Sequence, residues 1–276
     1  MGEHERDYDI AEIMGGLYGD GIIGLQGAFP RATIEALHER CLELYDEAAR
    51  IPDGAVPRGP NRWYVELQPE RLPSFAQIAG HPWFVAVSRA VLGADYKIVE
   101  FGFDIPLAGA ADQPWHRDFP GDSANRFGHR LSSLAFNVTT VDTRPEHGPF
   151  EIAPGTQWDD TSGANAEMFP SRDKWDRYQS LAVRKLPQRG DIAARTGLTI
   201  HRGTANVSGE PRPVLIIGAV ADDVADAERH QLQVTRAYLD GLPAVVRDHL
   251  FYRVTDTVGP LPQRHMIEGL LEPAYG

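Results

Sequence analysis

The alternation of apolar and polar positions predicts that the first 95 residues are mainly helical. Apolar side chains recur at helical spacing within residues 31–49, and a second helix is expected at 82–92, where Gly93 ends it. The positions that share the apolar face of the first helix are Ile34, Leu37, Cys41, Leu44 and Tyr45. Between the two helices, residues 61–67 predict a short strand or a covering segment.

The pattern changes to short strand-forming runs from residue 96 onward. The runs cover residues 96–107, 129–142, 148–155, 180–187, 190–196, 198–203 and 213–223. Gly, Pro, Asp and Asn separate them, and only residues 164–180 offer a helix, which Pro170 interrupts. Strands that do not alternate with helices argue against a Rossmann or TIM architecture and favour an antiparallel sandwich or barrel such as a jelly roll.

We therefore expect a mainly β, single-domain protein over residues 1–276. Its parts are a helical flank at 1–95, a β core at 96–222, and an extension at 223–276 that turns helical again and ends in a loop-like tail. A chain of 276 residues is long enough to bury a sizeable core.

Composition and charge narrow the class of partner. The net charge of −12 disfavours binding to nucleic acid, although a local basic pocket for a small anion stays compatible with it. No apolar run reaches the roughly 18 residues of a membrane span, and the acidic N-terminal stretch does not resemble a signal peptide. We expect a cytoplasmic protein that binds a small molecule and not a membrane, and we keep a homodimer open. Cys41 is the only cysteine, which excludes an internal disulfide and a cysteine-based metal site.

The stretch QPWHRDFPG, residues 113–121, contains the most specific candidate chemistry. His116 and Asp118 are two residues apart, so in a strand both side chains point to the same side and can reach one metal ion. Two histidines and one carboxylate form the facial arrangement of non-haem Fe(II) oxygenases. The tripeptide alone is also compatible with a solvated turn, so the interpretation needs a second histidine on a distant strand.

His201 is the best candidate for that second histidine. It lies 85 residues after His116, near the end of a short strand-forming run, and Arg212 follows it by eleven residues at the start of the next run. A strand, a turn and an antiparallel return would place Arg212 beside His201. An arginine there could bind a carboxylate with two parallel hydrogen bonds, as a dicarboxylate that chelates the metal would require.

These motifs together resemble the phytanoyl-CoA dioxygenase family of Fe(II)- and 2-oxoglutarate-dependent oxygenases. The resemblance covers about residues 96–220. It rests on His116-x-Asp118, the Gly148-Pro149…Pro154-Gly155-Thr156 stretch, Gly190-Asp191, and His201 followed by Asn206, Ser208 and Arg212. The family fold is a double-stranded β-helix of the jelly-roll, cupin-like type with flanking helices. This sequence departs from the family pattern at three positions. It has His147 where Asn is usual, Gln157 where His is usual, and Gly203 where some members carry a Ser that binds the cosubstrate.

The resemblance implies a role for each matching residue. His116, Asp118 and His201 become the iron ligands and catalytic centre, and Arg212 becomes the partner of the distal carboxylate of 2-oxoglutarate. Gln113 is expected to contact cosubstrate or substrate. Asn137 either points toward 2-oxoglutarate or is a buried amide satisfied by the backbone. Thr204 is a candidate to replace the serine missing at position 203.

The implied activity is a dioxygenase reaction that uses Fe(II), 2-oxoglutarate and O2. It would hydroxylate, desaturate, epoxidise or cyclise a small molecule, and the family often serves secondary metabolism. Halogenating members lack the carboxylate ligand, which Asp118 supplies here. Two alternatives stay open: a cupin-like metal enzyme that does not use 2-oxoglutarate, and a non-catalytic binding protein on the same barrel.

Overall fold

Two antiparallel sheets form the centre of the protein. The computed structural model describes residues 8–118, 128–160, 168–227 and 230–259. The large sheet has the order β1-β8-β5-β10-β4-β3-β2. Its strands are β1 (Ile22–Leu25), β8 (Ile192–Thr196), β5 (Ser133–Thr139), β10 (Val214–Val220), β4 (Lys97–Pro106), β3 (Arg62–Glu66) and β2 (Val56–Pro57). The small sheet has the order β7-β6-β9, made of Val183–Lys185, Phe150–Ile152 and His201–Gly203. This confirms the jelly-roll prediction.

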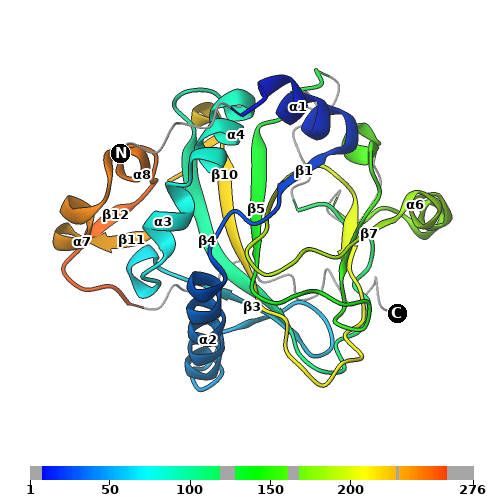
Figure 1. Ribbon diagram of the computed structural model, residues 1–276, viewed down its shortest axis with the longest axis horizontal. Coiled ribbons are helices and arrows are strands. Elements are labelled where there is room, and N and C mark those ends of the chain that lie inside the picture. Colours follow the sequence, from blue (N-terminus) through cyan, green and yellow to red (C-terminus); the bar gives the residue numbers. More distant parts are fainter. Residues whose placement is uncertain (1–7, 119–127, 161–167, 228–229, 260–276) are drawn as a thin grey trace.

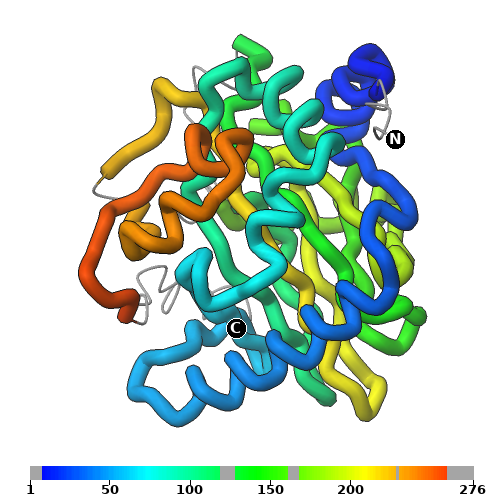
Figure 2. The backbone as a smooth tube through the Cα atoms, turned by 60° about the vertical axis from the view of Figure 1, so that its left-hand side comes forward, coloured from blue at the N-terminus to red at the C-terminus, as the bar shows by residue number. Residues whose placement is uncertain are grey.

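Helices cover the large sheet on its outer side (Figures 1 and 2). These helices are α1 (Ile10–Gly15), α2 (Arg31–Ala48), α3 (Phe75–Ala79), α4 (Pro82–Leu92), α7 (Arg236–Gly241) and α8 (Ala244–Arg247). Helix α6 (Trp175–Leu181) lies instead beside β7 of the small sheet. Shorter turns lie at Gly16–Asp20, Pro69–Arg71, Thr156–Trp158, Arg172–Lys174 and Asp222–Val224. The helices expected at 31–49 and 82–92 are confirmed, and in the part of 164–180 that is described, helix α6 begins only after Pro170.

The first 95 residues and the C-terminal extension differ from expectation in one respect. Strands β1, β2 and β3 precede residue 96 and complete both ends of the large sheet, so the flank is not only helical. In the extension, β11 (Gln233–Thr235) and β12 (Arg253–Thr255) form a separate parallel pair. The strand predicted at residues 61–67 is present as β3. The other four strands are two to four residues long, and runs this short carry too little periodicity to be predicted.

The hydrophobic core lies between the large sheet and its helices rather than between the two sheets. Phe75 of α3 meets Phe101 of β4 edge-on with ring centroids 4.8 Å apart, and Phe84 of α4 lies 3.9 Å from Phe136 of β5. Cys41 is buried in the same core, as its helical face predicts. The opposite, inner face of the sheet is therefore left to line an interior cavity.

One turn at the end of the barrel demands glycine. Gly190 has φ +99°, and a Cβ there would lie 2.5 Å from the carbonyl oxygen of Phe29. We predict that Gly190→Ala lowers the free energy of unfolding by about 1–3 kcal/mol, because both the backbone conformation and the space exclude a side chain. Gly209→Ala is the matched control, since nothing lies within 4 Å of its Cβ position, and it should change stability by less than about 0.5 kcal/mol. Urea unfolding measures the free energy of unfolding of both variants. Equal losses in the two would show that position 190 does not require glycine.

Candidate metal centre

A cavity of about 760 Å³ lies between the inner faces of the two sheets. Its lining includes His116, Asp118 and His201, which the sequence analysis had grouped together. One ligand atom from each of the three lies within 4.8 Å of the others, although they are up to 85 residues apart in sequence.

Main-chain pairing brings the two histidines together. His116 N donates to His201 O at 2.9 Å, and His201 N donates to His116 O at 2.8 Å. Gln113 N also donates to Gly203 O at 2.8 Å, so the segment before Asp118 runs antiparallel to β9 as a further edge of the small sheet. As in a strand, His116 and Asp118 then face the same side.

Both imidazoles are held in the tautomer that a metal ligand needs. Nδ1 of His116 lies 2.8 Å from Pro114 O, and Nδ1 of His201 lies 2.9 Å from Thr199 O. A carbonyl can only accept, so each Nδ1 carries the proton and each Nε2 keeps a free lone pair. Such backbone contacts fix the ring orientation of metal-binding histidines.

The third group, Asp118, is a carboxylate. Its Oδ2 pairs with Nη1 of Arg195, and its Oδ1 lies 3.4 Å from Nε2 of His201. Burial alone would raise the pKa of Asp118, but the Arg195 cation and the contact with His201 outweigh it and hold that pKa well below its usual range. Burial also lowers the pKa of His116 to about 3, and the pKa of His201 is lowered for the same reason. Two neutral imidazoles and one ionised carboxylate are the donor set of an Fe(II) facial site, so these residues fit that metal.

The lowered histidine pKa values predict an acid-sensitive metal-free protein. Since His116 has a pKa of about 3 in the folded chain against 6.5 ordinarily, the unfolded chain binds the extra proton first as pH falls. Stability is thus retained above pH 6.5 and lost as pH decreases from there toward 3. At pH 5, protonation of His116 in the unfolded chain should lower the free energy of unfolding by about 1–2 kcal/mol.

Urea unfolding of chelator-treated protein at pH 7 and pH 5 tests this loss. His116→Asn should reduce the difference in the free energy of unfolding between pH 7 and pH 5. His129→Gln, at an exposed position, should leave that difference unchanged. An unchanged difference in His116→Asn would show that another group titrates.

Arg212 lines the same cavity, but it does not reach it through the expected hairpin. β9 belongs to the small sheet and β10 to the large one, so the chain crosses between sheets after His201 instead of returning beside it. Arg212 Nε donates to His147 O at 3.0 Å, and its Nη2 donates to Gly148 O at 2.8 Å. No described carboxylate forms an ion pair with it. Burial, and then the charge of Arg62, lower its pKa to about 10.

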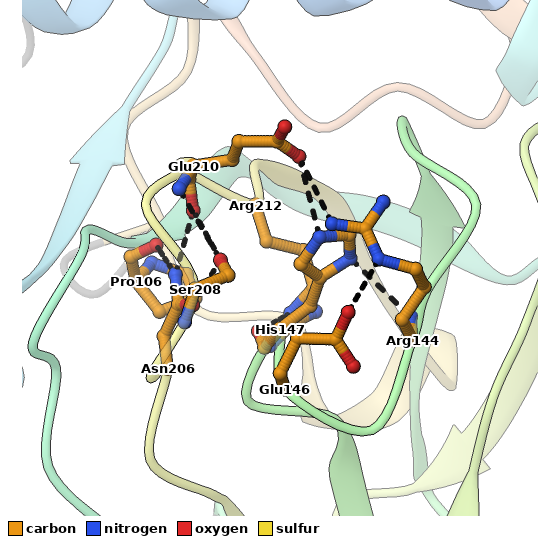
Figure 3. A network of polar contacts seen from close by, with 8 residues as sticks. All are labelled: Pro106, Arg144, Glu146, His147, Asn206, Ser208, Glu210 and Arg212. Carbon is orange, nitrogen blue, oxygen red and sulfur yellow. Dashed lines mark hydrogen bonds and ion pairs between the residues drawn. The ribbon is translucent and has the colours of Figure 1, made fainter.

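The crossing segment is held by the motif residues Asn206 and Ser208 (Figure 3). The Asn206 amide donates to Pro106 O at 3.1 Å and to Glu210 O at 2.8 Å, and the Ser208 hydroxyl donates to Asn206 Oδ1 at 2.6 Å. These two side chains therefore shape the loop that leads to Arg212 and do not contact the cavity. His147 lies on the facing segment, where its main chain pairs antiparallel with Asn206.

The remaining predicted contacts have mixed outcomes. Gln113 and Asn137 line the cavity. Gln113 Oε1 accepts from Gly203 N at 3.0 Å and its Nε2 donates to Arg58 O at 3.3 Å, so this side chain is fixed by protein groups. The Thr204 hydroxyl donates to Pro149 O at 2.7 Å, and Thr204 is not among the lining residues. Its side chain therefore does not replace the serine at 203.

The side chain of Arg62 occupies the space that a side chain at position 203 would need. A Cβ on Gly203 would lie 2.6 Å from Cζ of Arg62, so only glycine leaves room for this guanidinium. Arg62 is 2% exposed and pairs with Asp104 at 3.0 Å. Arg62 and Arg195 are two lining residues that the sequence pattern does not identify. Both are single arginines within strands, where a charged side chain is ordinarily read as facing solvent.

Comparison with known proteins then assigns the family. The family model described as phytanoyl-CoA dioxygenase (PhyH) matches residues 17–214. This chain belongs to the phytanoyl-CoA dioxygenase family. The chain is thus an enzyme of the Fe(II)- and 2-oxoglutarate-dependent dioxygenase class.

Solved structures share the fold of this phytanoyl-CoA dioxygenase family member. EctD from S. alaskensis with 2-oxoglutarate and 5-hydroxyectoine aligns with a TM-score of 0.64 and 16% identity, over 92% of this chain and 91% of that one. The epimerase SnoN in complex with Fe3+, alpha ketoglutarate and nogalamycin RO aligns with a TM-score of 0.63 and 17% identity, over 77% and 83%. HygX from Streptomyces hygroscopicus with nickel and 2-oxoglutarate aligns with a TM-score of 0.57 and 16% identity, over 79% and 92%.

Within the part of the chain that is described, no helix combines the length and apolar character that crossing a bilayer requires.

Proposed function

We propose that this enzyme oxidises a small molecule of secondary metabolism, with Fe(II) bound by His116, Asp118 and His201. The observation that carries the proposal is the convergence of these three side chains inside the cavity, with Arg212 lining the same space. The biosynthetic role is supported by the fold shared with SnoN and SnoK, two enzymes of nogalamycin biosynthesis. The cytoplasmic location and the homodimer stay predictions.

The chain's own residues would hold and orient the reactants. Iron with 2-oxoglutarate and O2 supplies the oxidant that removes hydrogen from a substrate carbon. Arg212 would bind the distal carboxylate of 2-oxoglutarate, because it is a buried cation whose described partners are main-chain carbonyls. Asn137 lines the cavity on β5 and would supply an amide to the same cosubstrate. The walls of the cavity limit water, which strengthens each of these contacts.

The carboxylate at position 118 favours oxygenation over halogenation, since it occupies the ligand position that halogenating family members leave for chloride. Hydroxylation, desaturation, epoxidation and ring formation all agree with this donor set.

Arg212 also weighs against a cupin-like enzyme that does not use 2-oxoglutarate. Such an enzyme has no need of a buried cation at this end of the cavity, and burying an arginine without a counter-charge is unfavourable. A purely binding protein would tolerate loss of a metal ligand, and all three ligands are present.

Anaerobic titration with Fe(II) and 2-oxoglutarate tests the proposal. We expect a weak visible charge-transfer band that requires both components, followed by succinate formation once O2 is admitted. Iron binding without a 2-oxoglutarate-dependent band would favour the cupin-like alternative. Absence of iron binding would favour the binding protein.

A further inference from the structure

A carboxylate on the large sheet lies in the same transverse row as the arginine beside the candidate metal centre. Antiparallel pairing aligns Arg195 of β8 with Ala135 of β5, then Gly218 of β10, then Glu100 of β4. Arg195 pairs with Asp118, so this row crosses the cavity wall at the level of the metal ligands. Arg195, Ala135 and Glu100 all line the cavity.

Among the described residues, Glu100 has a hydroxyl partner and no cationic one. The hydroxyl of Tyr64 donates to Glu100 Oε1 at 2.7 Å. Burial, followed by the charge of Glu100, raises the pKa of Tyr64 well above its ordinary value, so the phenol keeps its proton and remains the donor. Arg58 lies 5.0 Å over the Tyr64 ring, and no described cationic side chain forms an ion pair with Glu100.

The other carboxylates of the cavity already have partners. Asp104 pairs with Arg62 at 3.0 Å, and Asp118 pairs with Arg195. Asp191 accepts main-chain N–H groups from Gly27 and Gln188, each at 2.8 Å. Among the described lining residues, Glu100 is therefore the carboxylate that is left to bind a cation.

Two glycines make the space in which this carboxylate is held. A Cβ on Gly102 would lie 2.7 Å from the Tyr64 hydroxyl, and a Cβ on Gly218 would lie 2.9 Å from Glu100 Oε2. Glu100 thus leans over Gly218, toward β5 and the metal ligands. About two strand spacings, ~10 Å along the sheet, separate Gly218 from Arg195.

Two aromatic rings flank the candidate metal ligands. The ring of Phe150 lies 5.2 Å from that of His201, and the ring of Phe169 lies 5.9 Å from that of His116. Both phenylalanines line the cavity. A carbon-rich part of a ligand fits beside the metal, while a cationic part fits at Glu100.

We infer that Glu100, held in place by Tyr64, binds the ammonium group of an amine-bearing substrate whose oxidised carbon lies against Phe150 and Phe169. This specificity site rests on the proposed function for the oxidation itself. It narrows the substrate class to small amines whose cation and reacting carbon are separated by a distance on the order of 10 Å, about two strand spacings.

The test compares benzylammonium with benzyl alcohol, which have the same ring and differ in charge. Isothermal titration of the chelator-treated full chain measures both affinities, so the result does not depend on iron or 2-oxoglutarate. We expect the wild type to bind the ammonium compound at least tenfold more tightly. Glu100→Gln should remove this preference and leave the affinity for the alcohol within twofold.

Two further variants keep the inference testable if Glu100→Gln does not fold. Tyr64→Phe removes the positioning hydroxyl, and Gly218→Ala displaces the carboxylate while leaving its charge; each should reduce the preference severalfold. Glu43→Gln, at an exposed ion pair with Arg40 on α2, is the matched control and should keep it.

Equal wild-type affinities, undetectable benzylammonium binding, or an unchanged preference in folded Glu100→Gln would each overturn the inference. A failed amine preference together with an intact Fe(II)–2-oxoglutarate absorption band contradicts the substrate class alone. An intact preference without the band contradicts the proposed oxidation instead.

Discussion

Replacing Asp118 with alanine is expected to abolish 2-oxoglutarate-dependent succinate formation and to lower the free energy of unfolding by about 2–3 kcal/mol. Activity is lost because a metal ligand is missing. Stability falls because Arg195, whose side chain is 7% exposed, loses its carboxylate and remains a buried cation without a counter-charge. Removing one partner of a fully buried pair costs about 3–5 kcal/mol, and we take a lower value because the Asp118 side chain is 26% exposed.

A succinate assay and urea unfolding measure the two effects separately. Asp142→Ala is the matched control, since Asp142 forms a pair with Arg31 in which both side chains are exposed, 42% and 62%. It should cost at most about 1 kcal/mol and leave activity unchanged. Retention of half the wild-type turnover by Asp118→Ala would show that this carboxylate is not a ligand.

Replacing Arg212 with alanine is expected to raise the 2-oxoglutarate concentration needed for half-maximal succinate formation by roughly 30-fold or more. Leaving a buried carboxylate without its charged partner costs about 2–5 kcal/mol, and about 1.4 kcal/mol corresponds to a factor of ten. Arg247→Ala, at an exposed position on α8, should leave this concentration unchanged. An unaltered requirement in Arg212→Ala would exclude the assignment.

The same assignment predicts which cosubstrate mimics stabilise the wild type. N-oxalylglycine has both carboxylates and, at about 100 times its dissociation constant, should add about 2.7 kcal/mol to the iron-loaded protein. Pyruvate lacks the distal carboxylate and should add far less at the same concentration. Equal stabilisation by the two compounds would mean that Arg212 does not bind the distal carboxylate.

Local spacing was sufficient to predict that two of the three candidate metal ligands face the same side. His116 and Asp118 are two residues apart in an extended segment, and a strand places such residues on one side whatever the rest of the fold does. His201 required a distant pairing, which the order of the family motifs supplied. The helices at 31–49 and 82–92 were predicted for a similar reason, because each is long enough for its apolar face to repeat.

Sequence reasoning missed the charged lining residues Arg62, Glu100, Asp104 and Arg195, because the polar face of the large sheet faces the cavity and not bulk water. In β4 the polar face contains Glu100 and Asp104, and the apolar face contains Phe101, Phe103 and Ile105. Such alternation normally means that the polar face meets bulk water. Here helices cover the apolar face, and the polar face encloses the cavity, which no single strand can reveal.

The expected hairpin between His201 and Arg212 failed for a topological reason. A short turn between two strand-forming runs is compatible with pairing in one sheet or with a crossing to another. The hydrogen bonds of Asn206 to Pro106 and Glu210 direct the crossing, and the first of them depends on β4, 100 residues earlier in the chain.

The anchoring of Arg212 has a consequence for which sequences the enzyme tolerates. Its guanidinium is held by the carbonyl oxygens of His147 and Gly148. Every residue type offers a carbonyl, so the side chain at position 147 can change without loss of that anchor. This accounts for histidine where the family usually has asparagine. Gly148 has no such freedom, because its φ is +69° and a Cβ would lie 2.6 Å from the carbonyl oxygen of Thr204. Among related sequences, variation should therefore be found at position 147, and glycine should persist at 148.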